Sequence, residues 1–90
     1  MDEDKKPLRR KNLQIIDYKG TLYATFDGTR IWKLDRIAFG LIKMCDGKKT
    51  HRGIIKETAR KASLTIEDTR KGLQPIFDEL TRLNFIEWLD

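Results

Sequence analysis

Cysteine and histidine are scarce in this 90-residue sequence, which has one of each, Cys45 and His51. A lone cysteine forms no internal disulfide, and the two residues together fall short of the four ligands of a structural zinc site. Cys45 lies on the apolar stripe of an expected helix, where a buried thiol is far more common than a nucleophile. We therefore expect no metal, no cofactor and no Cys–His catalytic pair.

Long apolar runs and catalytic motifs are also missing. No segment approaches the roughly 20 apolar residues that cross a bilayer, and the polar N-terminal stretch lacks the apolar segment of a signal peptide. The sequence has no glycine-rich phosphate loop and no Ser–His–Asp set. These absences predict a soluble cytoplasmic protein that does not bind membranes and is not an enzyme.

Charge is abundant: 37% of the residues are charged, and the formal net charge is +5. Such a balance suits an acidic peptide or a nucleic acid as partner, although a solvated Lys/Arg surface gives the same composition. The densest cluster of cations, Lys5-Lys6 and Arg9-Arg10-Lys11, lies in the polar N-terminal stretch, which also contains Pro7. We expect residues 1–11 to form a flexible basic arm and residues 12–90 to form a single domain.

Three short strands are expected at the start of the domain. They are rich in β-branched, aromatic and aliphatic residues, and turn-forming Lys19-Gly20 and Asp27-Gly28-Thr29 separate them. The expected strands cover residues 13–18, 21–26 and 30–34. The sequence thus predicts an antiparallel meander. Strand alternation places Trp32 and Leu34 on the inward face of the third strand and Ile31 and Lys33 on the outward face.

Three helices follow, and each has a capping residue at its start: Asp35, Thr50 and Thr65. Apolar residues recur at helical spacing behind each cap. Pro75 lies inside the third helix, which predicts a kink or a break into two helices. Residues 85–89 are expected to pack back as an extended tail. The order predicts an α+β domain of the winged helix-turn-helix type, in which a three-stranded antiparallel meander precedes three helices.

The segment from Trp32 to Thr50 resembles the PqqD-like family. Members have a Leu-Asn pair, a helix of small and apolar residues, a Cys-Asp-Gly or Leu-Asp-Gly stop, and then a threonine and an isoleucine-containing helix. The segment from Asp78 to Ile86 is similar to the family's closing helix. Asp35 and Asn84 replace the usual Asn and Gly, and Pro75 is unusual at its position. The matching residues are Leu34, Ala38, Ile42, Cys45, Asp46, Gly47, Thr50 and Ile54.

The resemblance implies a RiPP precursor recognition element, a winged-helix-like domain that binds the leader of a ribosomally made precursor peptide. Such a domain presents the leader to a peptide-modifying enzyme, often a radical SAM protein. The leader adds as a strand beside the third strand and contacts the third helix. A free edge strand also permits dimers, so we expect a monomer or an edge-strand dimer. The expected peptide-binding residues are Arg30, Ile31, Trp32, Lys33, Arg70, Lys71, Gln74 and Phe77.

Two alternatives accompany this expectation. Trp32, which could stack on a ligand, is more often a core residue at such a position. Winged helix-turn-helix DNA binding by a transcriptional regulator would also suit the net charge of +5. A recognition helix, however, carries cationic or amide side chains near its N-terminus. The third helix instead begins with Glu67 and Asp68, which would face phosphates unfavourably, so peptide binding is the preferred hypothesis.

Overall fold

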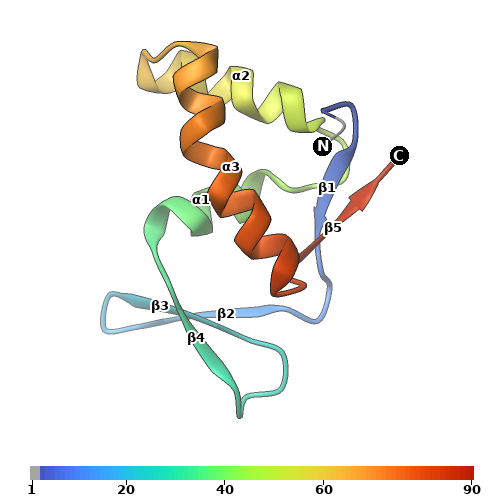
Figure 1. Cartoon of the computed structure of the whole chain (residues 1–90). Coiled ribbons are helices and arrows are strands. Elements are labelled where there is room, and N and C mark those ends of the chain that lie inside the picture. Colours follow the sequence, from blue (N-terminus) through green and yellow to red (C-terminus); the bar gives the residue numbers. More distant parts are fainter. Residues whose placement is uncertain (1–2) are drawn as a thin grey trace.

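The structure is a computed structural model that describes residues 3–90, so Met1 and Asp2 of the expected arm lie outside the described residues. It is a small α+β domain with a three-stranded antiparallel sheet followed by three helices, as predicted (Figure 1). The elements are β1 (Lys6–Arg9), β2 (Gln14–Tyr18), β3 (Thr21–Thr25), β4 (Ile31–Leu34), α1 (Arg36–Met44), α2 (His51–Ala62), α3 (Ile66–Arg82) and β5 (Ile86–Leu89).

Strands β2, β3 and β4 form the predicted meander in that spatial order. It occupies one end of the molecule, and the helices occupy the other (Figure 1). Alternation along β4 follows the prediction: Leu34 is buried and Trp32 packs against the core, whereas Ile31 is 56% exposed and Lys33 is exposed. One face of the sheet is therefore free of the core.

The three predicted helix caps are confirmed. The Asp35 carboxylate accepts a hydrogen bond from the Ala38 N–H at 2.7 Å, and the hydroxyls of Thr50 and Thr65 accept from backbone N–H groups three residues on, at 3.0 and 3.1 Å. These bonds satisfy donors that a helix start leaves free. Helix α3 runs through Pro75 without ending, so the alternative of two separate helices is wrong.

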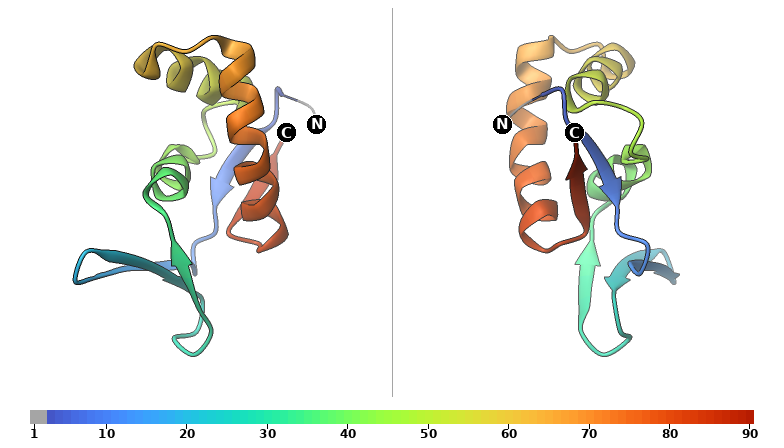
Figure 2. Two further views of the ribbon diagram at one scale, coloured as in Figure 1. Left: turned by 60° about the vertical axis from the view of Figure 1, so that its left-hand side comes forward. Right: turned by 90° about the vertical axis from the view of Figure 1, so that its right-hand side faces the viewer.

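The expected flexible arm is wrong for residues 6–9. They form β1, which pairs antiparallel with β5 and aligns Lys6 with Leu89 (Figure 2). Pro7 is fully buried, and its carbonyl accepts a hydrogen bond from the Gly47 N–H at 2.9 Å. The composition of residues 6–9 does not favour a strand. They form one because pairing with a segment far away in the sequence overrides a weak local propensity. Residues 86–89 are the extended tail that we expected to pack back.

The core lies between the inner face of the meander and the three helices. Phe77 and Ile54 are at 0% exposure, and Phe85 and Ile42 are at 1%. Cys45 is buried as expected, and this burial raises the pKa of its thiol to about 12, so the thiol stays protonated at neutral pH. Among residues 3–90 no helix has both the length and the apolarity needed to cross a membrane.

Candidate functional site

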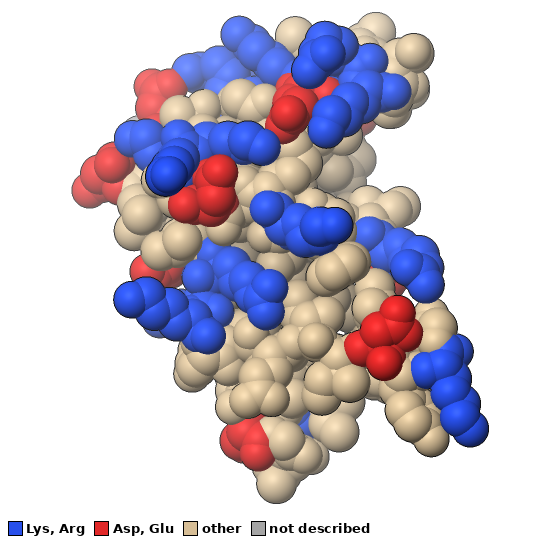
Figure 3. Space-filling view, turned by 180° about the vertical axis from the view of Figure 1, so that it is seen from behind, with Lys and Arg blue, Asp and Glu red and all other residues tan. Residues whose placement is uncertain are grey.

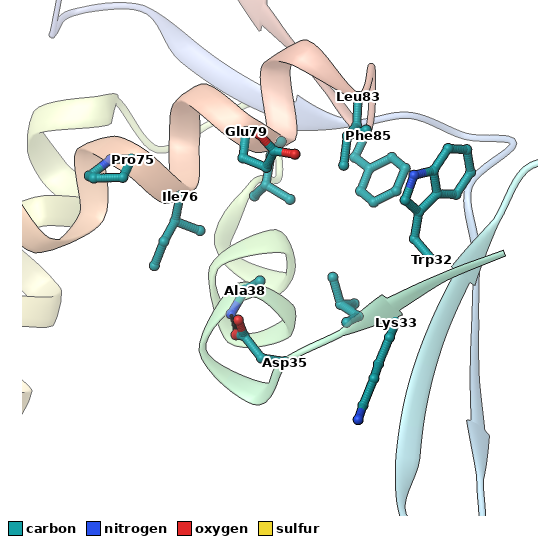
Figure 4. Close-up of a pocket in the computed structure, with 11 residues that line it drawn as sticks. Trp32, Lys33, Asp35, Ala38, Pro75, Ile76, Glu79, Leu83 and Phe85 are labelled. Atoms are coloured by element: carbon teal, nitrogen blue, oxygen red, sulfur yellow. Dashed lines mark hydrogen bonds between the residues drawn. The ribbon is translucent and has the colours of Figure 1, made fainter.

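A groove of about 310 Å³ lies between β4 and the second half of α3, and the start of α1 closes one end (Figure 4). We call it the β4–α3 groove. Its floor is apolar, and its few charged residues stand at the rim. It is lined by Trp32, Lys33, Leu34, Asp35, Ala38, Pro75, Ile76, Glu79, Leu80, Leu83 and Phe85.

One wall of the groove is an edge strand. In the described part of the chain β4 pairs with β3 alone, so its other edge has no strand beside it. Alternate residues of such an edge direct backbone N–H and C=O groups outward, where an added strand can bond to them. The groove thus combines backbone hydrogen-bonding groups on one side with apolar side chains on the other.

The aromatic end of the groove is held by three rings. The ring centroids of Trp32 and Phe85 are 5.4 Å apart in an edge-to-face arrangement, and Phe26 lies 6.3 Å from Trp32 and 5.6 Å from Phe85. The guanidinium of Arg30 lies 5.2 Å from the centroid of the Trp32 ring. Such contacts fix the orientation of a partly exposed indole, which then forms a preformed surface for an apolar side chain.

The charged side chains at the rim of the groove either bond to other residues of the domain or point away from α3. Arg82 donates two hydrogen bonds to the Glu79 carboxylate, and this pairing holds the pKa of Glu79 below its ordinary value. Asp35 is occupied by its cap on α1. The side chain of Lys33 extends from β4 to the side away from α3 (Figure 4). The interior therefore selects apolar side chains, and the rim adds little net charge.

The expected strand residues divide between two faces. Trp32 and Lys33 line the groove, Trp32 with its ring and Lys33 on the strand edge. Ile31 is exposed on the outer face of the sheet, beside Tyr23 and Ile16 in a small apolar depression. Arg30 reaches the site through its contact with Trp32. Of the four expected strand residues, Trp32 and Lys33 thus line the β4–α3 groove, whereas Ile31 lies on the other face of the sheet.

None of the expected helix residues lines the β4–α3 groove. Phe77 is fully buried in the core, in edge-to-face contact with His51 at 4.6 Å between centroids. Arg70 is bound to Glu3 and Glu67, and Gln74 donates to Asp78 at 2.8 Å. Lys71 is exposed but does not line the groove.

The helix face that lines the groove was missed. It comprises residues about one turn apart: Pro75 and Ile76, then Glu79 and Leu80, then Leu83. The sequence signal was membership of the apolar stripe, which includes Ile76 and Leu83. The structure adds that these two are only partly buried, whereas Phe77 and Leu80 are buried in the core. When the apolar stripe of a helix is wider than the surface that packs on the core, one edge of the stripe stays accessible to a ligand. The sequence does not show which edge this is.

No protein-family model, no curated protein and no solved structure matched the chain. Within residues 3–90, no group of three or more His, Cys, Asp and Glu side chains is placed to hold a metal ion.

Proposed function

We propose that the chain is a non-catalytic binding module that captures the leader region of a ribosomally made precursor peptide. In this proposal the leader adds as a strand to the free edge of β4 and places alternate side chains in the β4–α3 groove. The domain then presents the peptide to a cytoplasmic modifying enzyme, such as a radical SAM protein. The PqqD-like family and a winged-helix-like arrangement are parts of the same proposal.

One observation carries it: within residues 3–90, the edge of β4 that has no neighbouring strand borders an apolar groove, and a helix closes the far side of that groove. Backbone bonds to β4 would supply affinity that is independent of ligand sequence, and the floor around Trp32, Ile76 and Leu83 would select apolar side chains. DNA binding is less well supported, because Glu67 and Asp68 are both exposed in the first turn of α3.

The direct test is a titration of isotope-labelled protein with the leader of a precursor encoded beside this gene. We expect the backbone amide signals of Ile31–Leu34 to shift, together with those of Ile76 and Leu83. The substitution Ile76→Arg places a charge in the groove and should weaken binding about ten-fold or more. The matched control is Ile66→Arg on the same helix, because Ile66 is 42% exposed and does not line the groove.

Two outcomes would contradict the proposal. The first is an unchanged set of β4 amide signals at saturating peptide. The second is tight binding to duplex DNA that persists at raised salt, since binding through a solvated basic surface alone weakens steeply as salt rises.

A further inference from the structure

A second groove, of about 520 Å³, lies between α1, the end of α2 and α3. We call it the α1–α2 groove. Apolar side chains form much of its lining, among them Ile37, Leu41 and Leu73. Ile37 is 67% exposed, the highest value among the large exposed apolar side chains of the described chain. Ile37 extends the apolar lining of the groove to the surface, and a contiguous apolar surface of this kind marks interaction sites, whereas a single exposed side chain does not.

The charged residues that line this groove are all cations: Arg36, Lys43 and Lys61. Carboxylates of the domain neutralise these positive charges only in part. Lys61 Nζ lies 3.8 Å from Glu57, a carboxylate that also pairs with Lys49 at 3.4 Å. Helix α1 contains no carboxylate. Lys and Arg also predominate over Asp and Glu on the face seen from behind (Figure 3). The groove therefore favours an acidic ligand.

The other two cations, Arg36 and Lys43, form no ion pair with a carboxylate among residues 3–90. One guanidinium nitrogen of Arg36 donates to the Gly20 carbonyl at 3.1 Å, and Lys43 Nζ lies 5.2 Å from the centroid of the Phe39 ring. Neither the carbonyl nor the ring carries a full negative charge, so within the described residues both positive charges lack a carboxylate partner. A carboxylate of a bound ligand would compensate them at the rim of the groove.

Gly40 lies on the exposed surface of α1 and lines the same groove. A glycine inside a helix is destabilising relative to alanine. Nothing within the described domain explains its presence, because a Cβ built at Gly40 would meet no atom within 4 Å. A position without a side chain allows another backbone to approach the helix closely.

The two grooves adjoin along α3 and α1. Leu73 lines the α1–α2 groove and Ile76 lines the β4–α3 groove, three residues away on the same helix. Ile37 and Ala38, neighbours in α1, line one groove each. Three residues of helix rise about 4.5 Å, and an extended chain covers that distance in about two residues. One peptide can therefore occupy both grooves with a short connection.

We propose that the α1–α2 groove binds a second segment of the peptide that adds to β4, and that this segment carries Asp or Glu beside large apolar residues. The inference rests on the proposed function and specifies its ligand class. The ligand has a strand-forming segment for β4 and, a few residues away, an acidic and apolar segment for α1 and α2. Two modest contacts on one chain reinforce each other through effective concentration.

The test uses a display library of random 20-residue peptides selected on the intact domain. Selected peptides are then measured against the double variant Lys43→Glu/Lys61→Glu. Its matched control is Lys48→Glu/Lys56→Glu, which changes the net charge equally at exposed positions outside both grooves. We expect selected peptides to carry the acidic and apolar segment and to lose about ten-fold in affinity with the first variant. The control should change affinity by less than about two-fold.

A second variant, Gly40→Leu, fills the groove with a residue that favours the helix. We expect weaker peptide binding with an unchanged or raised melting temperature, so that loss of binding is not confused with unfolding.

The outcomes separate the inference from the proposed function. Peptides that are insensitive to Lys43→Glu/Lys61→Glu and to Gly40→Leu, but are lost with Ile76→Arg, would overturn the inference and leave strand addition intact. Equal losses in the charge variant and its control would overturn it as well, because the effect would be one of overall charge. A library that yields no peptide sensitive to Ile76→Arg would overturn both. Tight binding of duplex DNA that only the groove charge variant abolishes would reassign the α1–α2 groove to nucleic acid.

Discussion

Arg70 of α3 holds Glu3 of the N-terminal segment through two hydrogen bonds, from Nε to Oε2 at 2.6 Å and from Nη2 to Oε1 at 3.0 Å. The pair joins residues 67 positions apart and is only partly exposed. It fastens the N-terminal segment to the helix bundle. A cation expected to meet a ligand is instead committed to an internal contact, and this has consequences for stability.

Glu3 should contribute to acid sensitivity. The hydrogen bond from Arg70 is the main cause that lowers the pKa of Glu3 below its ordinary value of 4.5. A carboxyl group whose pKa is lower in the folded than in the unfolded protein stabilises the fold. This contribution is complete at pH values above the unfolded-state pKa and is lost as pH falls through the folded-state pKa. Glu3→Gln should therefore cost about 1 kcal/mol at pH 7 and flatten the loss of stability below pH about 4.5. Urea unfolding from pH 3 to 7 measures both effects.

Glu79→Gln is the matched control for Glu3→Gln, because Glu79 pairs with Arg82 on the surface of α3. Exposed pairs within a helix contribute little to stability, so Glu79→Gln should cost less than Glu3→Gln. An equal cost for the two variants would show that the Glu3 pair does not fasten the N-terminal segment.

His51 should make the domain less stable below neutral pH. The side chain is 1% exposed, between Phe77 and Trp88, and neither ring nitrogen has a hydrogen-bond partner among the described residues. Burial lowers the pKa of His51 below 6.5, and this effect outweighs that of Glu3, which raises it. As pH falls, His51 is therefore protonated in the unfolded chain before it is protonated in the folded protein. The free energy of unfolding is unaffected by His51 above pH about 6.5 and decreases as pH drops below that value. His51→Leu should remove this slope between pH 7 and 5 in urea unfolding.

An unchanged slope in the His51→Leu variant would mean that another group titrates in this range. The Glu3→Gln variant discriminates, because its effect lies at lower pH than that of His51.

Phe77 should act on stability and not on ligand contact. It is fully buried, so Phe77→Ala removes a core ring at a cost of about 3–5 kcal/mol. Gln74→Ala, one turn earlier on α3, should change stability by less than about 0.5 kcal/mol. Thermal and urea unfolding measure the difference. A Phe77→Ala protein that keeps its stability would contradict the core assignment.

Gly47 is predicted to be required where α1 gives way to the loop before α2. Its φ is +77°, and an added Cβ would lie 3.2 Å from Leu8 Cδ1 and 3.3 Å from Leu89 Cδ1. Gly47→Ala should therefore cost more than the about 1–2 kcal/mol of a left-handed alanine alone. Gly20→Ala is the control, because Gly20 has a φ of +84° and open space around it. Equal costs in the two variants would show that the contact with β1 and β5 is unimportant.

Much of the fold was predictable because its determinants are local. The caps Asp35, Thr50 and Thr65 and the turn at Asp27-Gly28 act within a few residues, and each lies where the sequence placed it. Strand β1 was missed because Lys6–Arg9 has no alternating apolar pattern, and only its pairing with β5 makes it a strand. Such a partner, about 80 residues away, leaves no local trace.

The site was predictable on its strand side only. Side chains alternate between the two faces of a strand, so the residues that face the core can be either of two alternating sets. The burial of Leu34 shows which set faces the core in β4. On α3 the apolar stripe is wide, so the boundary between core and groove is set by the distance of α3 from β4 and α1. This distance is a property of the tertiary structure. It assigns Phe77 to the core and Ile76 to the groove, although the two are neighbours in sequence.

The pairing of β1 with β5 has a consequence for engineering. Because Lys6 lies opposite Leu89, the two ends of the domain are one strand spacing apart, about 5 Å. A short linker could join them, and a new pair of ends could be opened at the exposed Asp27-Gly28 turn. The domain could equally be inserted into a loop of a carrier protein by two adjacent connections. Neither rearrangement substitutes a residue that lines the β4–α3 groove.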